Sequence, residues 1–267
     1  WLYWLTNHET ITAGFRVSLA KSHSVQTQKL IEEFKPDLVI STQTTGSAVM
    51  SYLKKAGLYK NKFAIAFSDF HLHRYWLYNE ADFYLVNIGE QKQEMVRLGV
   101  NPETIFVAGM TLKDKPNVDE LAVEQQLGIP ISNKVVLMGS GSLGIGSTKE
   151  SLLETISAIR KTLNENLPAS FVIVCGKNNE LFESFKSIND QNILALSFYS
   201  PMSELYEISS IFITKPGGMS VSESLQASLP LVVTHWLPGQ EELNYEYLSA
   251  KRLIIPAAHL KNVDELG

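Results

Sequence analysis

The segment Phe212-Ile213-Thr214-Lys215-Pro216-Gly217-Gly218-Met219-Ser220-Val221-Ser222-Glu223 decides the fold class of this 267-residue chain. The apolar run 211–214 predicts a buried strand, and residues 220–227 have the spacing of a helix. The Pro-Gly-Gly between them marks a tight turn, because glycine permits backbone conformations and close approaches that other residues do not. A strand that passes through such a turn into a helix is a basic unit of parallel α/β folds.

The same segment predicts a binding site for a phosphate-bearing ligand. Hydroxyl groups of Ser220 and Ser222 in the first turn of a helix suit phosphate oxygens, and the Glu223 carboxylate could accept two hydrogen bonds from a ribose diol. Alternatively, Ser220 is the N-cap and Glu223 the N3 residue of a capping box. Both can hold, since a capping glutamate can still present an oxygen to a sugar. The turn residues that would let a ligand approach the backbone are Pro216, Gly217 and Gly218.

Outward from this segment, short apolar runs alternate with helical patterns along the chain. The polar, proline-bearing stretch 110–117 separates two such blocks and is interpreted as a linker. We therefore expect two Rossmann-like domains, residues 1–112 and 113–267, with parallel sheets that face a cleft. The run 38–42 is continuously apolar, as in strands that a parallel sheet buries on both faces. The other expected strands are 63–67, 83–86, 105–108, 135–138, 171–174, 193–196 and 231–234, and the other expected helices are 26–34, 48–56, 90–98, 149–163, 179–188 and 202–209.

Composition excludes several classes of protein. A chain that is 45% hydrophobic and 10% aromatic is not intrinsically disordered, and a single cysteine, Cys175, cannot form an internal disulfide. No apolar run reaches the roughly 18 residues of a membrane span. The net charge of −5 disfavours a nucleic-acid partner. Residues 1–115 carry +2 and the rest −7, so the first half could face an anionic membrane, or both charges simply reflect solvated surfaces.

A second candidate phosphate loop follows the strand 135–138. Gly139, Ser140 and Gly141 begin a G-x-G-x-x-G pattern between a strand and a helix, where backbone N–H groups can approach a phosphate. A dinucleotide would also require a carboxylate at the end of the next strand, and that strand instead runs into Cys175-Gly176-Lys177-Asn178. The pattern therefore favours another phosphate-bearing ligand, or it is only a tight turn.

A third polar loop, Leu237-Pro238-Gly239-Gln240-Glu241-Glu242-Leu243-Asn244, follows the strand 231–234. It should lie at the carboxyl edge of the sheet, where open α/β folds bind ligands. Glutamine, glutamate and asparagine together offer the donors and acceptors that a polyhydroxylated sugar needs. Alternatively, the loop is only the polar start of a helix. The candidate ligand-binding residues here are Gly239, Gln240, Glu241 and Asn244.

These motifs, in this order, resemble glycosyltransferase family 28, and within it the branch of monogalactosyldiacylglycerol synthases and processive diacylglycerol glucosyltransferases. The branch reads C-G-K/R-N, I-T-K-P-G-G-x-x-x-S-E and P-G-Q-E-x-x-N, which this chain matches at 175–178, 213–223 and 238–244. It departs from the branch in the glycine loop, at Ser140 and Ser142. The resemblance implies the GT-B fold class, which is α/β with two Rossmann-like domains.

The first half resembles the acceptor domain of the same family. Residues 34–42 are similar to its K-P-D-x-x-x-S-T strand, and residues 68–76 to its T-D-F-x-x-H-x-x-W segment. Asp69 and His73 could act as acid–base or orienting groups, or Asp69 caps a turn and His73 is a packed histidine. A metal is not expected, because no further carboxylate or cysteine ligands accompany His71 and His73.

The resemblance also assigns roles within the second half. It implies that uridine lies against Ser197-Phe198-Tyr199, that Glu223 holds the ribose and that Gly217, Gly218 and Ser220 meet the diphosphate. Gln240 and Glu241 would hold the sugar hydroxyls, with Asn244 as a further candidate. The complete set of expected donor-binding residues is Gly139, Ser140, Gly141, Gly176, Asn178, Phe198, Tyr199, Pro216, Gly217, Gly218, Ser220, Ser222, Glu223, Gly239, Gln240, Glu241 and Asn244.

The resemblance implies transfer of a hexose from a UDP-sugar to a diacylglycerol-type lipid by a peripheral enzyme at the cytoplasmic face of a membrane, with no metal and no cofactor. Alternatives are a lipid-linked peptidoglycan precursor as acceptor, a UDP-N-acetylglucosamine 2-epimerase, and a non-catalytic nucleotide-sugar-binding fragment. The chain lacks an initial Met, has no counterpart of the family's first strand and His-bearing loop, and stops at 264–267 in an apparent helix start. We therefore expect both domains to be truncated and the catalytic base to lie in the missing loop.

Overall fold

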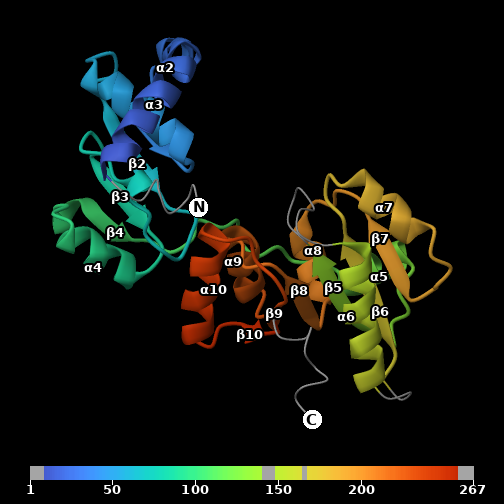
Figure 1. The fold of residues 1–267 in the computed structure, drawn as a ribbon. Helices are drawn as coiled ribbons and strands as arrows, with labels where there is room; N and C mark the ends of the chain where they lie inside the picture. The colour runs from blue at the N-terminus through green and yellow to red at the C-terminus, as the bar shows by residue number, and fades with distance from the viewer. Residues whose placement is uncertain (1–8, 140–147, 164–166, 258–267) are drawn as a thin grey trace. The chain divides into compact units, whose positions relative to one another are not determined.

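A computed structural model describes residues 9–139, 148–163 and 167–257 of the chain. The chain divides into two compact units, Trp1–Thr111 (unit 1) and Leu112–Gly267 (unit 2). Each unit is built on its own parallel sheet (Figure 1).

Unit 1 has a four-stranded parallel sheet in the order β1-β2-β3-β4. Its strands are β1 (Leu38–Ser41), β2 (Lys62–Ala66), β3 (Phe83–Val86) and β4 (Ile105–Val107). Its helices are α2 (Glu9–Phe34), α3 (Thr44–Lys55) and α4 (Gly89–Arg97), with 3₁₀ turns η1 (Arg74–Trp76) and η2 (Pro102–Thr104). The core forms where α3 and α4 pack onto the sheet, and its largest fully buried side chains are Leu53, Phe63, Ile65, Met95 and Ile105.

The prediction that residues 38–42 form a strand buried on both faces is wrong in its second part. Residues 38–41 do form β1, but Leu38 is 46% exposed and Ile40 is 50% exposed. Within the described residues β1 is an edge strand, with β2 as its one partner. Only Val39, on the opposite face, packs against the core. A continuous apolar run therefore does not distinguish an edge strand from a central one.

Unit 2 has a six-stranded parallel sheet in the order β10-β9-β8-β5-β6-β7. Its strands are β5 (Lys134–Gly139), β6 (Ala169–Val174), β7 (Ile193–Leu196), β8 (Ile211–Thr214), β9 (Leu231–Val233) and β10 (Ile255–Pro256). Its helices are α5 (Glu120–Leu127), α6 (Lys149–Thr162), α7 (Asn179–Lys186), α8 (Met202–Ile208), α9 (Gly218–Gln226) and α10 (Gln240–Ala250). The core includes Leu137, Met138, Phe171, Ile173 and Phe185, all nearly inaccessible to solvent.

The helix α5 had no counterpart among the expected elements. Asp119 is its N-cap and accepts from Ala122 N at 3.1 Å, and Gly128, with φ 68°, ends it. Only one of its side chains, Val123, is buried. A single buried position does not produce the apolar periodicity by which a helix is predicted.

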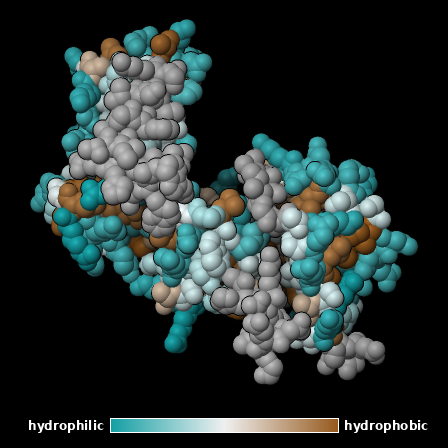
Figure 2. Space-filling model, viewed as in Figure 1, coloured by the Kyte–Doolittle hydropathy of each residue, from teal (hydrophilic) through white to brown (hydrophobic). Residues whose placement is uncertain are grey.

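Hydrophobic residues reach the surface of each unit in patches beside larger hydrophilic areas (Figure 2). In unit 1 the exposed side chains include Phe106 and Val107 of β4, and in unit 2 they include Phe198 and Ile255. Among the described residues, no helix is both long and apolar enough to cross a membrane.

Candidate functional site

The strand order of unit 2 places a topological switch point between β5 and β8. From β5 the chain moves outward through β6 and β7, then returns to β8 on the other side of β5 and continues to β9 and β10. Loops that leave adjacent strands in opposite directions open a crevice at the carboxyl edge, where α/β sheets bind ligands. The loop after β8 is therefore at the centre of the candidate site.

The helix α9 begins at Gly218, earlier than the expected start at Ser220. Gly217 is its N-cap, and its carbonyl accepts the first helical hydrogen bond from Val221 N at 3.0 Å. The predicted capping box of Ser220 and Glu223 is therefore wrong. Ser220 is the third helical residue, whereas Ser222 and Glu223 lie in the second turn, and Ser222 is only 8% exposed.

This helix N-terminus has the properties of an anion site. No side chain caps it, so its first N–H groups have no side-chain acceptor within the described residues. A Cβ added at Gly217 would meet no atom within 4 Å, so the space beside the turn is open. Thr214, the last residue of β8, is 2% exposed, and no group in the described ranges forms a hydrogen bond with its Oγ1. An uncapped helix start beside a buried, unpartnered hydroxyl suits a phosphate-bearing ligand.

The Glu223 side chain is partly buried, and one of its oxygens is already held. The hydroxyl of Tyr206, from α8, donates to Glu223 Oε2 at 3.1 Å. Within the described residues Glu223 Oε1 has no hydrogen-bond partner. The carboxylate can therefore accept further hydrogen bonds through Oε1. No sequence signal indicates a role for Tyr206, because no motif pairs it with a residue 17 positions away.

The first turns of α10 are tied to the loop after β8 by two contacts. Asn244 has no exposed surface, and its Nδ2 donates to Pro216 O at 3.1 Å. Lys215 Nζ lies 2.7 Å from Glu241 Oε1, with both side chains at least four-fifths buried. Asn244 therefore positions the Pro216 turn, and its contact with a ligand stays a prediction.

Among the predicted sugar-binding residues, only Gln240 is well exposed. Glu241 Oε1 is taken by Lys215, and its Oε2 accepts from Leu237 N at 2.9 Å. Gly239 precedes α10 with φ 98°, a conformation that strongly favours glycine. Gln240, the first residue of α10, is exposed at the carboxyl edge.

Only the first residue of the glycine loop after β5 belongs to the described residues. Gly139 is the last residue of β5, whereas Ser140 and Gly141 lie outside the described residues. After β6, Gly176 has φ 62°, and Asn178 caps α7 by accepting from Leu181 N at 3.0 Å. Asn178 thus has a structural task that does not depend on a ligand.

After β7, Phe198 and Tyr199 differ in exposure. Phe198 is 60% exposed and could stack on a planar base. The Tyr199 hydroxyl donates to Glu204 Oε2 at 2.6 Å. Burial, followed by the hydrogen bond to Glu204 and its charge, raises the pKa of Tyr199 to about 12. Tyr199 therefore stays protonated and keeps its donor directed at Glu204.

In unit 1 the predicted pair Asp69 and His73 lies after β2, and both are buried, at 3% and 5% exposure. His73 Nδ1 accepts from Tyr75 N at 3.1 Å at the start of η1. The neutral ring therefore carries its proton on Nε2, which can donate but not accept. His73 is therefore packed, as one of the two alternatives held, but it caps a turn itself, a role which that alternative gave to Asp69. An acid–base role for the pair remains a prediction.

A buried amide pair that sequence analysis missed holds the loop of Asp69. Gln91, on α4, is 1% exposed and its Nε2 donates to Asp69 O at 2.9 Å and His71 O at 2.8 Å. Its Oε1 accepts from Asn87 N at 2.8 Å and Ile88 N at 3.2 Å. Asn87 Nδ2 adds a bond of 2.8 Å to Asp69 O. The two amides therefore hold the backbone of residues 69–71 in place.

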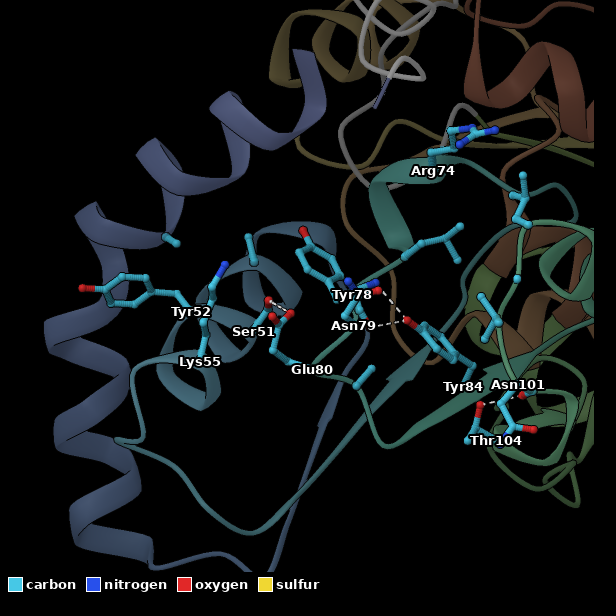
Figure 3. A pocket seen from close by; sticks show the side chains of 17 residues that line it. Ser51, Tyr52, Lys55, Arg74, Tyr78, Asn79, Glu80, Tyr84, Asn101 and Thr104 are labelled. Atoms are coloured by element: carbon cyan, nitrogen blue, oxygen red, sulfur yellow. Dashed lines mark hydrogen bonds between the residues drawn. The ribbon is translucent and has the colours of Figure 1, made fainter. Parts of the chain in front are cut away.

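A cavity of ≈ 660 Å³ lies elsewhere in unit 1, lined by α3, η1 and the segments that lead into β3 and β4 (Figure 3). Two hydrogen bonds lie in its lining. Ser51 Oγ donates to Glu80 Oε2 at 2.6 Å, and the Tyr84 hydroxyl donates to Tyr78 O at 2.6 Å. The lining segments 77–81 and 98–104 lie at the amino ends of strands, away from the edge where α/β sheets bind ligands.

No metal centre is apparent in the part of the chain that the structure describes, because no three His, Cys, Asp or Glu side chains gather there. That transfer needs no metal stays a prediction.

Comparison with known proteins identifies the family. The family model described as monogalactosyldiacylglycerol (MGDG) synthase matches residues 2–112, and the model of the glycosyltransferase family 28 C-terminal domain matches residues 142–252. The chain belongs to glycosyltransferase family 28. The predicted family is therefore confirmed, and the MGDG synthase match places this family 28 chain in the predicted branch.

Curated relatives of this family 28 chain include the processive diacylglycerol beta-glucosyltransferase of Staphylococcus aureus strain JH9. The two are 31% identical over 229 residues, which cover 83% of this chain and 56% of the relative. The chain thus spans about half the length of the curated relatives it matches.

Solved structures support the fold. The glycotransferase of kitacinnamycin has a TM-score of 0.63 at 12% identity, and the match covers 93% of this chain and 70% of the glycotransferase chain. The UDP-GlcNAc 2-epimerase of Methanocaldococcus jannaschii, in complex with UDP-GlcNAc and UDP, has a TM-score of 0.57 at 15% identity, with 88% and 74% covered. The predicted GT-B class, α/β with two Rossmann-like units, is confirmed. That the two sheets face a common cleft stays a prediction.

Proposed function

We propose that this family 28 chain binds a UDP-sugar on unit 2 and transfers its hexose to a diacylglycerol-type lipid. The observation that carries the proposal is the uncapped start of α9 at the switch point, with Thr214 Oγ1 and Glu223 Oε1 both without partners among the described residues. The relative from S. aureus is named a diacylglycerol glucosyltransferase, which supports this donor and acceptor chemistry.

The proposed donor pose follows from the loops at the carboxyl edge. The diphosphate would accept hydrogen bonds from N–H groups at the start of α9, beside Gly217, Gly218 and Ser220. Glu223 Oε1 would accept from the ribose, and the exposed ring of Phe198 would stack on uracil. Gln240 would donate to the hexose hydroxyls, whereas Glu241 acts by fixing its loop through Lys215.

The proposed chemistry is hexose transfer with UDP as the leaving group. Negative charge develops on the diphosphate as the bond to the sugar breaks. Backbone N–H dipoles that are already fixed would stabilise this charge without reorganisation and without a metal or cofactor. In unit 1, the Asp69 loop would orient the acceptor hydroxyl. We further propose that the protein acts peripherally at the cytoplasmic face of a membrane, because its acceptor is a lipid.

A transfer assay tests the proposal. The chain is incubated with radiolabelled UDP-glucose, UDP-galactose or UDP-N-acetylglucosamine and with diacylglycerol vesicles, and UDP binding is measured by calorimetry. We expect UDP binding and a labelled glycolipid from one UDP-hexose. Label on a peptidoglycan precursor instead, or conversion of UDP-N-acetylglucosamine to its 2-epimer, would contradict the proposed acceptor. UDP binding without any transfer would support a binding fragment, and absence of UDP binding would overturn the donor site.

Thr214→Val should raise stability while weakening UDP binding. The change keeps the shape of the side chain but removes a buried hydroxyl that has no partner in the described ranges, so the free energy of unfolding should rise by about 1 kcal/mol. If the hydroxyl donates to bound ligand, UDP affinity should fall about fivefold. Thermal melts and calorimetry measure the two effects.

Thr155→Val is the matched control, because the Thr155 hydroxyl already donates to Ser151 O at 2.8 Å on α6. This variant should gain no stability and should bind UDP as the wild type does. If Thr214→Val lost stability and kept its UDP affinity, Thr214 would have only a structural task.

A further inference from the structure

Tyr206 and Glu223 form a buried contact between α8 and α9. Tyr206 is 4% exposed, and its ring packs at a tilt against Phe212 of β8, with ring centroids 5.5 Å apart. From this position the hydroxyl donates to Glu223 Oε2 at 3.1 Å. The ring is thus a rigid support that brings one donor to one carboxylate oxygen.

The Tyr206 hydroxyl is protonated, and therefore a donor, at neutral pH. Burial and then the charge of Glu223 raise the pKa of Tyr206, against a smaller lowering by the Ser220 hydroxyl. The hydrogen bond from this phenol restrains the carboxylate, with Oε2 occupied and Oε1 without a partner in the described part of the chain.

We propose that Tyr206 is a positioning residue for ligand binding, which holds the Glu223 carboxylate so that Oε1 meets the ribose hydroxyls of a uridine nucleotide. The inference rests on the proposed function, because it takes Glu223 as the ribose-binding group. A free glutamate side chain loses conformational entropy when a ligand fixes it. Tyr206 removes most of that loss before the ligand arrives.

The test is a double-mutant cycle on UDP affinity. Tyr206→Phe removes one oxygen atom and keeps the ring against Phe212, so we expect UDP affinity to fall about tenfold. In a Glu223→Ala background, Tyr206→Phe should have almost no further effect, because the group through which it acts is gone. Discrimination between UDP and 2′-deoxy-UDP should also fall in Tyr206→Phe, which a general loss of packing would not produce.

Tyr59→Phe is the control for deletion of a buried phenol oxygen. The Tyr59 hydroxyl donates to Lys62 O at 3.0 Å in unit 1, so this variant should lower the melting temperature and leave UDP affinity unchanged. If Tyr206→Phe bound UDP as the wild type does, or lost as much affinity in the Glu223→Ala background as in the wild type, the inference would fail. If Glu223→Ala itself bound UDP normally, the ribose assignment of the proposed function would fail instead.

Discussion

Gln91→Leu is expected to lower the free energy of unfolding of unit 1 by about 4 kcal/mol. The leucine fills a similar volume but cannot replace any of the four hydrogen bonds that the Gln91 amide makes with the backbone. Two N–H groups and the His71 carbonyl lose this partner in a buried site, and each such loss costs roughly 1–3 kcal/mol. Urea unfolding, followed through the buried Trp76, measures the change.

Gln93→Leu is the matched control, since Gln93 lies on the same helix with its side chain exposed. It should change stability by less than about 0.5 kcal/mol. Hydrogen exchange should also become faster at residues 67–71 in Gln91→Leu and not in Gln93→Leu. Equal stability of the two variants would show that the amide pair does not hold the loop.

Glu223→Ala is expected to weaken UDP binding about 100-fold, the second large effect. A carboxylate that accepts from ribose hydroxyls makes charge-assisted hydrogen bonds, each worth roughly 1.5–3 kcal/mol. Calorimetric titration with UDP measures the loss, and a melting curve checks that the fold is kept.

Glu154→Ala provides a close control. Glu154 is the sixth residue of α6, as Glu223 is of α9, and its side chain is exposed. UDP affinity should change less than about twofold in this variant. An unchanged UDP affinity in Glu223→Ala would remove Glu223 from the site.

The sequence predicted the sheets well, because each strand is a short apolar run closed by a turn signal. Expected runs 83–86, 193–196 and 211–214 coincide with β3, β7 and β8. The start of α9 was misplaced because Ser220 and Glu223 match a capping box in spacing. The glycines before them allow the helix to begin two residues earlier, with the Gly217 carbonyl accepting its first hydrogen bond.

The candidate site was predicted residue by residue, but its supports were not. Tyr206, Gln91 and Asn87 act through contacts between residues 17 to 22 positions apart. No local periodicity or motif encodes such a contact, which depends on how helices pack onto the sheet. For the same reason no sequence signal indicates that Asn244, which is predicted to contact a ligand, also donates to Pro216 O from a buried position.

The hydrogen bond from Asn244 to Pro216 couples helix α10 to the turn after β8, although the two residues are 28 positions apart in the sequence. If the two segments separated, the fully buried Asn244 amide would lose its hydrogen bond to Pro216 O, which costs roughly 1–3 kcal/mol. Tilting α10 therefore displaces the turn at Gly217 as well. A substitution that shifts α10, and so moves Gln240 toward a different hexose, would therefore also change the affinity for the nucleotide. A substitution that changes only the Gln240 side chain would not.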